Sequence, residues 1–143
     1  MPLVYLDASA LLKTIREEEG TIALQAYLRG ADLASSELVL TEVPRSLRRI
    51  AAENPHFQLE PAMRRTEERF DSMAFRPIDE ALLIGAGMLA EPNLRSLDAI
   101  HVVSALYLYP IDAFVTYDKR QAAVARLAGL KTVAPGVDSQ APL

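Results

Sequence analysis

The segment LVYLDASALLKTI, residues 3–15, indicates the fold class of this chain. Its first four residues, Leu3 to Leu6, form a continuous apolar run, which is typical of a strand buried on both faces of a parallel sheet. Asp7 ends that run, and ASALLKTI then shows helical spacing. We therefore expect an α/β unit with Asp7 at the carboxyl end of a buried strand.

The rest of the chain repeats this alternation of short apolar runs and helical patterns. Further strands are predicted at 32–35, 73–76, 113–116 and 131–133. Helices are predicted after Gly20, over 37–53, 61–71 and 79–89, within 94–109, and from 118 to 129. Such alternation predicts a mostly parallel sheet with helices on both faces. In sheets of this kind, reactive groups gather beyond the carboxyl ends of the strands.

Two of these helices carry more detailed expectations. In the helix that Gly30 ends, the residues predicted to face inward are Ile22, Ala23, Ala26, Tyr27 and Leu28. In the helix over 37–53, Pro44 lacks a backbone donor, so we expect either a kink there or a start near Thr41.

Composition limits the classes of function. A chain of 143 residues, half of them hydrophobic, fits one domain with a real core. The absence of cysteine excludes thiolate metal sites, and it suits a reducing cytoplasm. No signal peptide or membrane span is recognisable, so we expect a cytoplasmic protein. The net charge of −4 counts against a simple DNA-binding module but not against a nuclease, because bound metal adds positive charge.

Two aspartates follow predicted strands directly. Asp7 is a candidate metal ligand, and it is equally a candidate N-cap of the helix that begins near Ser9. Asp118 repeats the arrangement, and with Gln121 it forms a capping-box pattern. Ser9 and Thr116 could supply further oxygens near the same strand ends.

Two more acids stand on helices. Asp98 precedes an almost wholly apolar, buried helix, so its carboxylate either caps a helix that begins at Ala99 or is paired or bound to metal. Glu42 shares a helix face with Arg45 and Arg49. That face is either a salt-bridge ladder or a carboxylate beside phosphate-binding arginines.

Together, the four acids can meet at one edge of the sheet. Several oxygen ligands without cysteine suit Mg²⁺ or Mn²⁺ better than zinc. His101, one helical turn after Asp98, is interpreted as a satisfied core residue rather than a catalytic base, and Tyr5 as a core residue.

With these residues in place, the chain resembles VapC-type toxins, the PIN-domain ribonucleases of toxin–antitoxin pairs. The likeness runs from VYLDASALLK to GLKTVAP. It is carried by LDAS (6–9), SELVLTEVPRSLRR (36–49), SLDAIHVVSA (96–105) and VTYDKR (115–120).

The sequence from Pro135 onward predicts a loose tail over 136–143. The resemblance implies a three-layer α/β/α fold, with a PIN domain over residues 1–135. It implies a Mg²⁺ or Mn²⁺ site formed by the family's four acids, with small hydroxyl residues beside it and arginines holding the RNA. In this sequence, these are the acids Asp7, Glu42, Asp98 and Asp118, the hydroxyl residues Ser9 and Thr116, and the arginines Arg45 and Arg49. It also implies a homodimer, an RNA substrate, and inhibition by a cognate VapB-type antitoxin.

Three other classes of protein share some of these features. A haloacid-dehalogenase-type phosphatase requires a second aspartate at the position of Ser9. A phospho-receiver domain requires a lysine in the loop after its last strand, whereas Lys131 begins the last predicted strand here. A non-catalytic PIN-like scaffold that binds RNA or protein remains the alternative, which the intact acidic set argues against.

Overall fold

The computed structural model describes residues 1–137 and contains a five-stranded sheet in which every neighbouring pair of strands is parallel. The strand order is β3-β2-β1-β4-β5, so β1 lies at the centre. The strands are β1 (Leu3–Leu6), β2 (Asp32–Ser36), β3 (Met73–Arg76), β4 (Ala113–Val115) and β5 (Thr132–Val133). All five predicted strands are confirmed, with bounds that differ by a residue at most.

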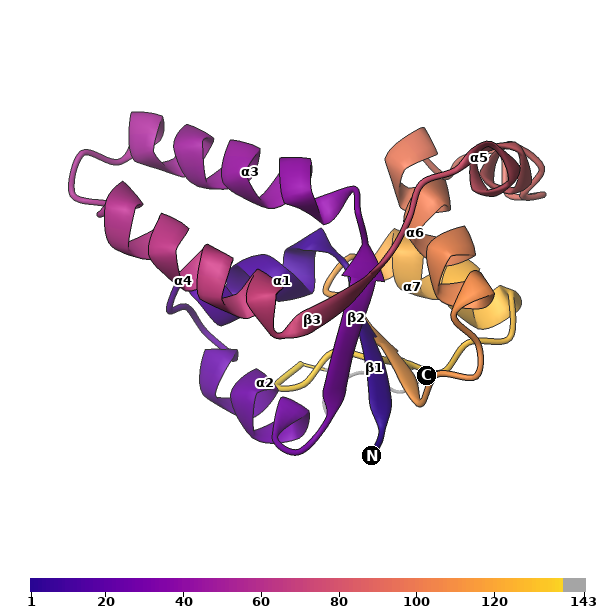
Figure 1. Ribbon diagram of the computed structural model, residues 1–143, viewed down its shortest axis with the longest axis horizontal. Coiled ribbons are helices and arrows are strands. Elements are labelled where there is room, and N and C mark those ends of the chain that lie inside the picture. The colour runs from indigo at the N-terminus through magenta and orange to yellow at the C-terminus, as the bar shows by residue number, and fades with distance from the viewer. Residues whose placement is uncertain (138–143) are drawn as a thin grey trace.

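Helices cover both faces of this sheet and complete the three layers predicted from the sequence. The helices are α1 (Ala8–Ile15), α2 (Thr21–Leu28), α3 (Val39–Glu53), α4 (Leu59–Asp71), α5 (Glu80–Gly87), α6 (Ser96–Tyr107) and α7 (Lys119–Leu127). The first four lie on one side of the sheet and the last three on the other (Figure 1).

The order of the strands creates a switch point beside β1. The chain runs from β1 outward to β2 and β3, and then returns to place β4 on the other side of β1. In open parallel sheets, ligands bind beyond the carboxyl ends of strands at such a point. Asp7 directly follows β1, and Thr116 directly follows β4, so the fold brings both to this edge.

Side-chain alternation along the central strands divides the core between the two faces. Val4 and Leu6 pack with α1 to α4, whereas Tyr5 packs with α6 and α7. In β4, Val115 joins the first core and Phe114 the second. Tyr5, Leu6, Phe114 and Val115 are fully buried, as expected for strands covered on both faces.

The inward face predicted for α2 is mostly wrong. The buried residues are Thr21, Leu24 and Leu28, whereas Ile22 is 83% exposed and Tyr27 is 38% exposed. The helix is apolar on nearly all sides, so its periodicity did not identify the face that packs on the protein.

The start predicted for α3 is also corrected. The helix begins at Val39, two residues after the predicted Glu37, and not near Thr41. Pro44 therefore lies inside the helix. In the first turn of this helix, the carbonyl groups of residues 37 and 38 accept the backbone hydrogen bonds. Val39, Val43 and Leu47 form its buried stripe.

Of the tail predicted over 136–143, residues 138–143 lie outside the described part of the chain. Gly136 has a φ of 89°, and a Cβ there would come within 3.3 Å of Ala23 in α2. Within residues 1–137, none of the helices combines the length and the apolar character required for a membrane span.

Candidate active site

Asp7 lies at the centre of the candidate site, almost completely buried at 2% exposure. It is the N-cap of α1, and its Oδ1 accepts hydrogen bonds from the Ala10 backbone N–H at 3.0 Å and from the Ser9 hydroxyl at 2.6 Å. Its Oδ2 accepts a short hydrogen bond from the Thr116 hydroxyl. Burial raises the pKa of Asp7, against the attraction of His101 and these hydrogen bonds. Asp7 is thus a helix cap and also a buried acid at the switch point.

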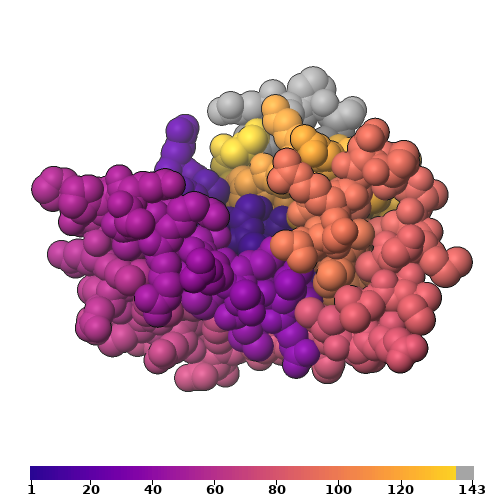
Figure 2. Space-filling model, turned by 90° about the horizontal axis from the view of Figure 1, so that it is seen from above, coloured from indigo at the N-terminus to yellow at the C-terminus, as the bar shows by residue number. Residues whose placement is uncertain are grey.

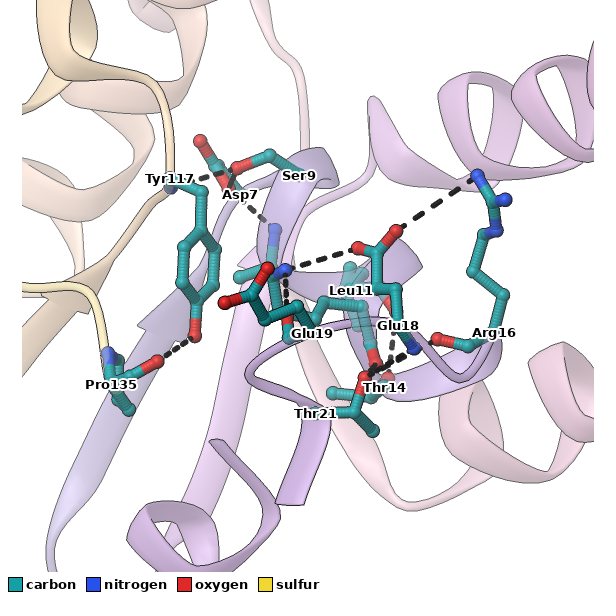
Figure 3. A network of polar contacts seen from close by, with 12 residues as sticks. Asp7, Ser9, Leu11, Thr14, Arg16, Glu18, Glu19, Thr21, Tyr117 and Pro135 are labelled. Carbon is teal, nitrogen blue, oxygen red and sulfur yellow. Dashed lines mark hydrogen bonds and ion pairs between the residues drawn. The ribbon is translucent and has the colours of Figure 1, made fainter. Parts of the chain in front are cut away.

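The two predicted hydroxyl residues join the ends of β1 and β4. Ser9 Oγ, besides donating to Asp7, accepts from the backbone N–H of Tyr117 at 3.1 Å (Figure 3). Thr116 Oγ1 donates to Asp7 and accepts from the backbone N–H of Asp118 at 3.1 Å. Both hydroxyls therefore hold Asp7 in place and couple it to the segment that leads into α7.

Asp118 is the N-cap of α7, as the sequence suggested. Its Oδ1 accepts from the backbone N–H groups of Arg120 and Gln121 at 2.9 and 3.2 Å. A capping box also requires the Gln121 side chain to accept a hydrogen bond from the backbone N–H of Asp118. This part of the prediction is wrong, because the Gln121 side chain instead donates to the carbonyl of Asp98 at 3.0 Å. This bond ties the start of α7 to the first turn of α6.

Asp98 does not cap its helix. Because α6 begins at Ser96, with Arg95 as the N-cap, Asp98 lies within the first turn, and the predicted cap of a helix beginning at Ala99 is wrong. The pKa of Asp98 is raised by partial burial and then by the negative charges of Asp118 and Asp7. Asp98 is therefore close enough to both Asp118 and Asp7 to feel the repulsion of their charges.

Glu42 reaches the site from the opposite layer. It lies in the first turn of α3, and its Oε1 is 2.7 Å from Nε2 of His101 in α6. The alternative of a salt-bridge ladder is not seen, since no ion pair joins Glu42 to Arg45 or Arg49 in the described residues. Both arginines are exposed.

The contribution of His101 to the candidate site was not predicted from the sequence. It is buried at 2% exposure, as predicted for a core residue, but its partners are Glu42 and the Tyr5 hydroxyl. Its position one turn after Asp98 was the available signal.

The carboxyl edge of the sheet forms a hollow between the two helical layers. Seen from above, the indigo N-terminal segment lies at its floor, between the purple chain around α3 and the orange chain around α6 (Figure 2). The carboxylates of this edge lie just after β1, in α3, in α6 and just before α7, so no single element forms the site.

The chemistry of these side chains fits a divalent cation. Clustered carboxylates raise one another's pKa, and a cation between them relieves the repulsion that acts on Asp98. Oxygen donors of this kind suit Mg²⁺ or Mn²⁺. No three acidic or histidine side chains within residues 1–137 are already arranged as a metal-binding group. Both oxygens of Asp7 are engaged by the cap and the hydroxyls, so convergence of all four acids on one ion stays a prediction.

An entirely parallel α/β/α fold with acidic residues beyond its central strands is the architecture of the PIN-domain class. The PIN domain family matches residues 4–127. The chain belongs to this family and, within it, to the VapC-type ribonuclease toxins.

Near-full-length relatives support this assignment. The chain is 33% identical over 140 residues to ribonuclease VapC47 of Mycobacterium tuberculosis (strain CDC 1551 / Oshkosh), covering 94% of this chain and 98% of the relative. It is 36% identical over 142 residues to ribonuclease VapC49 of Mycobacterium tuberculosis (strain ATCC 25618 / H37Rv), covering 94% and 96%.

Two solved structures share the fold. One is VapBC2 from Rickettsia felis bound to a DNA fragment from their promoter, with a TM-score of 0.67 at 12% identity, covering 93% of this chain and 98% of that chain. The other is PAE2754 from Pyrobaculum aerophilum, with a TM-score of 0.64 at 20% identity, covering 92% and 91%.

Proposed function

We propose that this protein is a metal-dependent endoribonuclease that hydrolyses phosphodiester bonds in RNA. In this proposal, it is the toxin of a type II toxin–antitoxin pair, acts in the cytoplasm, and is neutralised by a VapB-type antitoxin. The observation that carries the proposal is the position of Asp98 at the switch point of the sheet, where partial burial and then the charges of Asp118 and Asp7 raise its pKa. Relatives over nearly the whole chain are ribonucleases by name.

The acidic residues would hold the metal. A bound Mg²⁺ or Mn²⁺ supplies a Lewis acid for the phosphoryl oxygen and lowers the pKa of a bound water. Asp7, Asp98 and Asp118 are the proposed ligands, and Glu42 is either a fourth ligand or the group that orients the attacking water. Ser9 and Thr116 orient the Asp7 carboxylate through their hydroxyl groups.

Cationic side chains on α3 would hold the RNA. Arg45 and Arg49 are exposed, follow Glu42 along the same helix and are free of ion pairs among the described residues. Guanidinium groups bind phosphate oxygens with two parallel hydrogen bonds. These contacts would position the backbone and carry no base specificity.

Protein partners are part of this proposal. One solved neighbour is a VapBC structure, which supports an antitoxin partner. Helix α5 and its C-cap residue expose Leu83, Ile84 and Met88 at 48%, 56% and 78%, and such exposed apolar side chains support a homodimer or another protein contact.

The test is cleavage of a structured RNA, such as transfer RNA, with Mn²⁺ and with EDTA. We expect Mn²⁺-dependent cleavage that falls at least about 100-fold in Asp98→Asn, while circular dichroism and Tm show an intact fold. RNA binding without cleavage in any divalent ion would instead establish the non-catalytic scaffold.

A further inference from the structure

A buried line of three polar side chains runs from the central strand to the candidate site. The Tyr5 hydroxyl in β1 is 2.7 Å from Nδ1 of His101, and Nε2 of His101 is 2.7 Å from Oε1 of Glu42. Tyr5 is 0% exposed and His101 is 2% exposed, whereas the Glu42 side chain is 20% exposed. The line therefore starts inside the core and ends where solvent and substrate can reach.

The acceptor at the outer end determines which ring nitrogen carries a hydrogen. The Glu42 carboxylate can only accept, so at 2.7 Å Nε2 of His101 must be the donor. At the other ring nitrogen stands a hydroxyl, which can donate or accept. The Tyr5 phenol carries its proton at neutral pH, so it is available as a donor.

The inner end of the line is rigid. The Tyr5 ring stacks on Phe114, with centroids 5.1 Å apart and planes 12° from parallel, and it meets the His101 ring edge-on at 5.9 Å. Phe114 is fully buried in the neighbouring strand β4. The position of the Tyr5 hydroxyl is thus set by the sheet itself, and through it the plane of the imidazole.

The outer end needs such support. Glutamate has three rotatable bonds, and within residues 1–137 no hydrogen bond or ion pair joins the Glu42 side chain to another residue of α3. The His101–Glu42 bond crosses from the helical layer with α6 to the layer with α3 (Figure 1). It therefore holds together the two sides of the hollow as well as the carboxylate.

We propose that Tyr5 and His101 are positioning residues that hold Glu42 in its working orientation, with Tyr5 acting through His101. The inference rests on the proposed ribonuclease function, to which it adds two buried residues that never touch RNA. Partners of this kind behind site residues typically change activity about 10–100-fold when removed.

The first test is independent of catalysis. The chain has two histidines, and His56 is exposed, so a ¹⁵N spectrum of the imidazoles in the metal-free protein is assigned with His56→Ala. We expect Nε2 of His101 to carry a hydrogen that exchanges slowly with water, and we expect this exchange to accelerate in Tyr5→Phe. A hydrogen-free Nε2 in the native protein, or an unchanged signal in Tyr5→Phe, would overturn the proposal.

The second test separates kcat from KM for RNA cleavage. Tyr5→Phe should lower kcat about 10-fold and change KM by no more than about twofold, because the hydroxyl lies too deep to contact substrate. His101→Gln places an amide N–H near the position of Nε2, whereas His101→Asn does not. We therefore expect His101→Gln to retain at least about 10-fold more activity than His101→Asn.

A purely structural role is distinguished by a matched core variant. Val102, next to His101 in α6, is fully buried and outside this line of bonds, so Val102→Ala should lower Tm and leave kcat unchanged. Equal losses of kcat in Val102→Ala and Tyr5→Phe would refute positioning. If the native protein cleaves no RNA, the proposed function fails, and the ¹⁵N measurement still decides whether the hydrogen-bonded line exists.

Discussion

The amino-terminal ends of α1 and α5 have the same local structure and opposite electrostatics. Asp7 caps α1 and Asp79 caps α5, each with an extended backbone. Each accepts a hydrogen bond from the backbone N–H three residues later, at 3.0 Å from Ala10 and at 2.8 Å from Leu82. Judged by the cap alone, the two residues are equivalent.

Their surroundings differ. The pKa of Asp79 is lowered by the Leu82 backbone bond and by Arg76, with which it forms an ion pair at 3.1 Å. The pKa of Asp7 is raised by burial, and its own charge raises the pKa of Asp98. The cap and the ion pair with Arg76 account for Asp79, whereas burying the Asp7 carboxylate near Asp98 costs more stability than a cap requires. That excess marks the end of α1 as a candidate site.

The largest expected effect is a difference in RNA cleavage between variants of the two capping residues. Asp7→Asn keeps an oxygen that can cap α1 but removes the charge, so RNA cleavage should fall at least about 100-fold. Asp79→Asn is the matched control, and its rate should stay within about twofold of the native rate. Initial rates on one structured RNA with Mn²⁺ measure both. Equal rates in the two variants would reduce Asp7 to an ordinary cap.

The sequence predicted most of the fold because strand burial on both faces leaves a clear pattern. Leu3 to Leu6 and the segment around Phe114 are continuously apolar, and the covering helices follow at regular intervals. The face of α2 could not be predicted, since Ile22 and Leu24 are equally hydrophobic and only the packing decides which is buried.

The candidate site could be predicted from the sequence where its proposed residues follow strands. Asp7 and Asp118 were identified by their position after an apolar run, and Asp98 by the apolar helix behind it. The hydrogen bond between Glu42 and His101 could not be predicted, because 59 positions separate the two residues and the pattern of one helix gives no information on its contact with the other. Only the three-dimensional arrangement shows that the two layers meet there.

The second prediction concerns metal binding. Mn²⁺ should raise the stability of the native protein by about 2.7 kcal/mol at a concentration 100-fold above its Kd, because only the folded state gathers the acids. The shift should be much smaller in Asp98→Asn and unchanged in Asp79→Asn. Thermal unfolding with Mn²⁺ or EDTA measures it. A full shift in Asp98→Asn would place the ion away from the acidic edge.

A smaller effect belongs to the ordinary cap. Asp79→Ala removes the acceptor for Leu82 and the ion pair with Arg76, so Tm should fall at neutral pH. Because folding lowers the pKa of Asp79, its stabilisation is present above the unfolded pKa of about 4 and is lost as the pH falls through the folded value. The difference in Tm from the native protein should therefore shrink in acid; a constant difference would exclude the charge as its source.

The smallest expected effect has the opposite sign, and it tests whether the acidic edge is destabilising without metal. Folding raises the pKa of Asp98, so its charged form opposes folding at neutral pH. Asp98→Asn should stabilise the EDTA-treated protein by about 0.5 kcal/mol after solvent screening of this half-buried group, or about 2 °C in Tm. The gain should begin to shrink as the pH falls through the raised pKa of Asp98, and it should vanish below the unfolded pKa of about 4, where the carboxyl is neutral in both states. A loss of stability at pH 7 would mean that Asp98, like Asp79, serves the fold, and the contrast between the two helix ends would disappear.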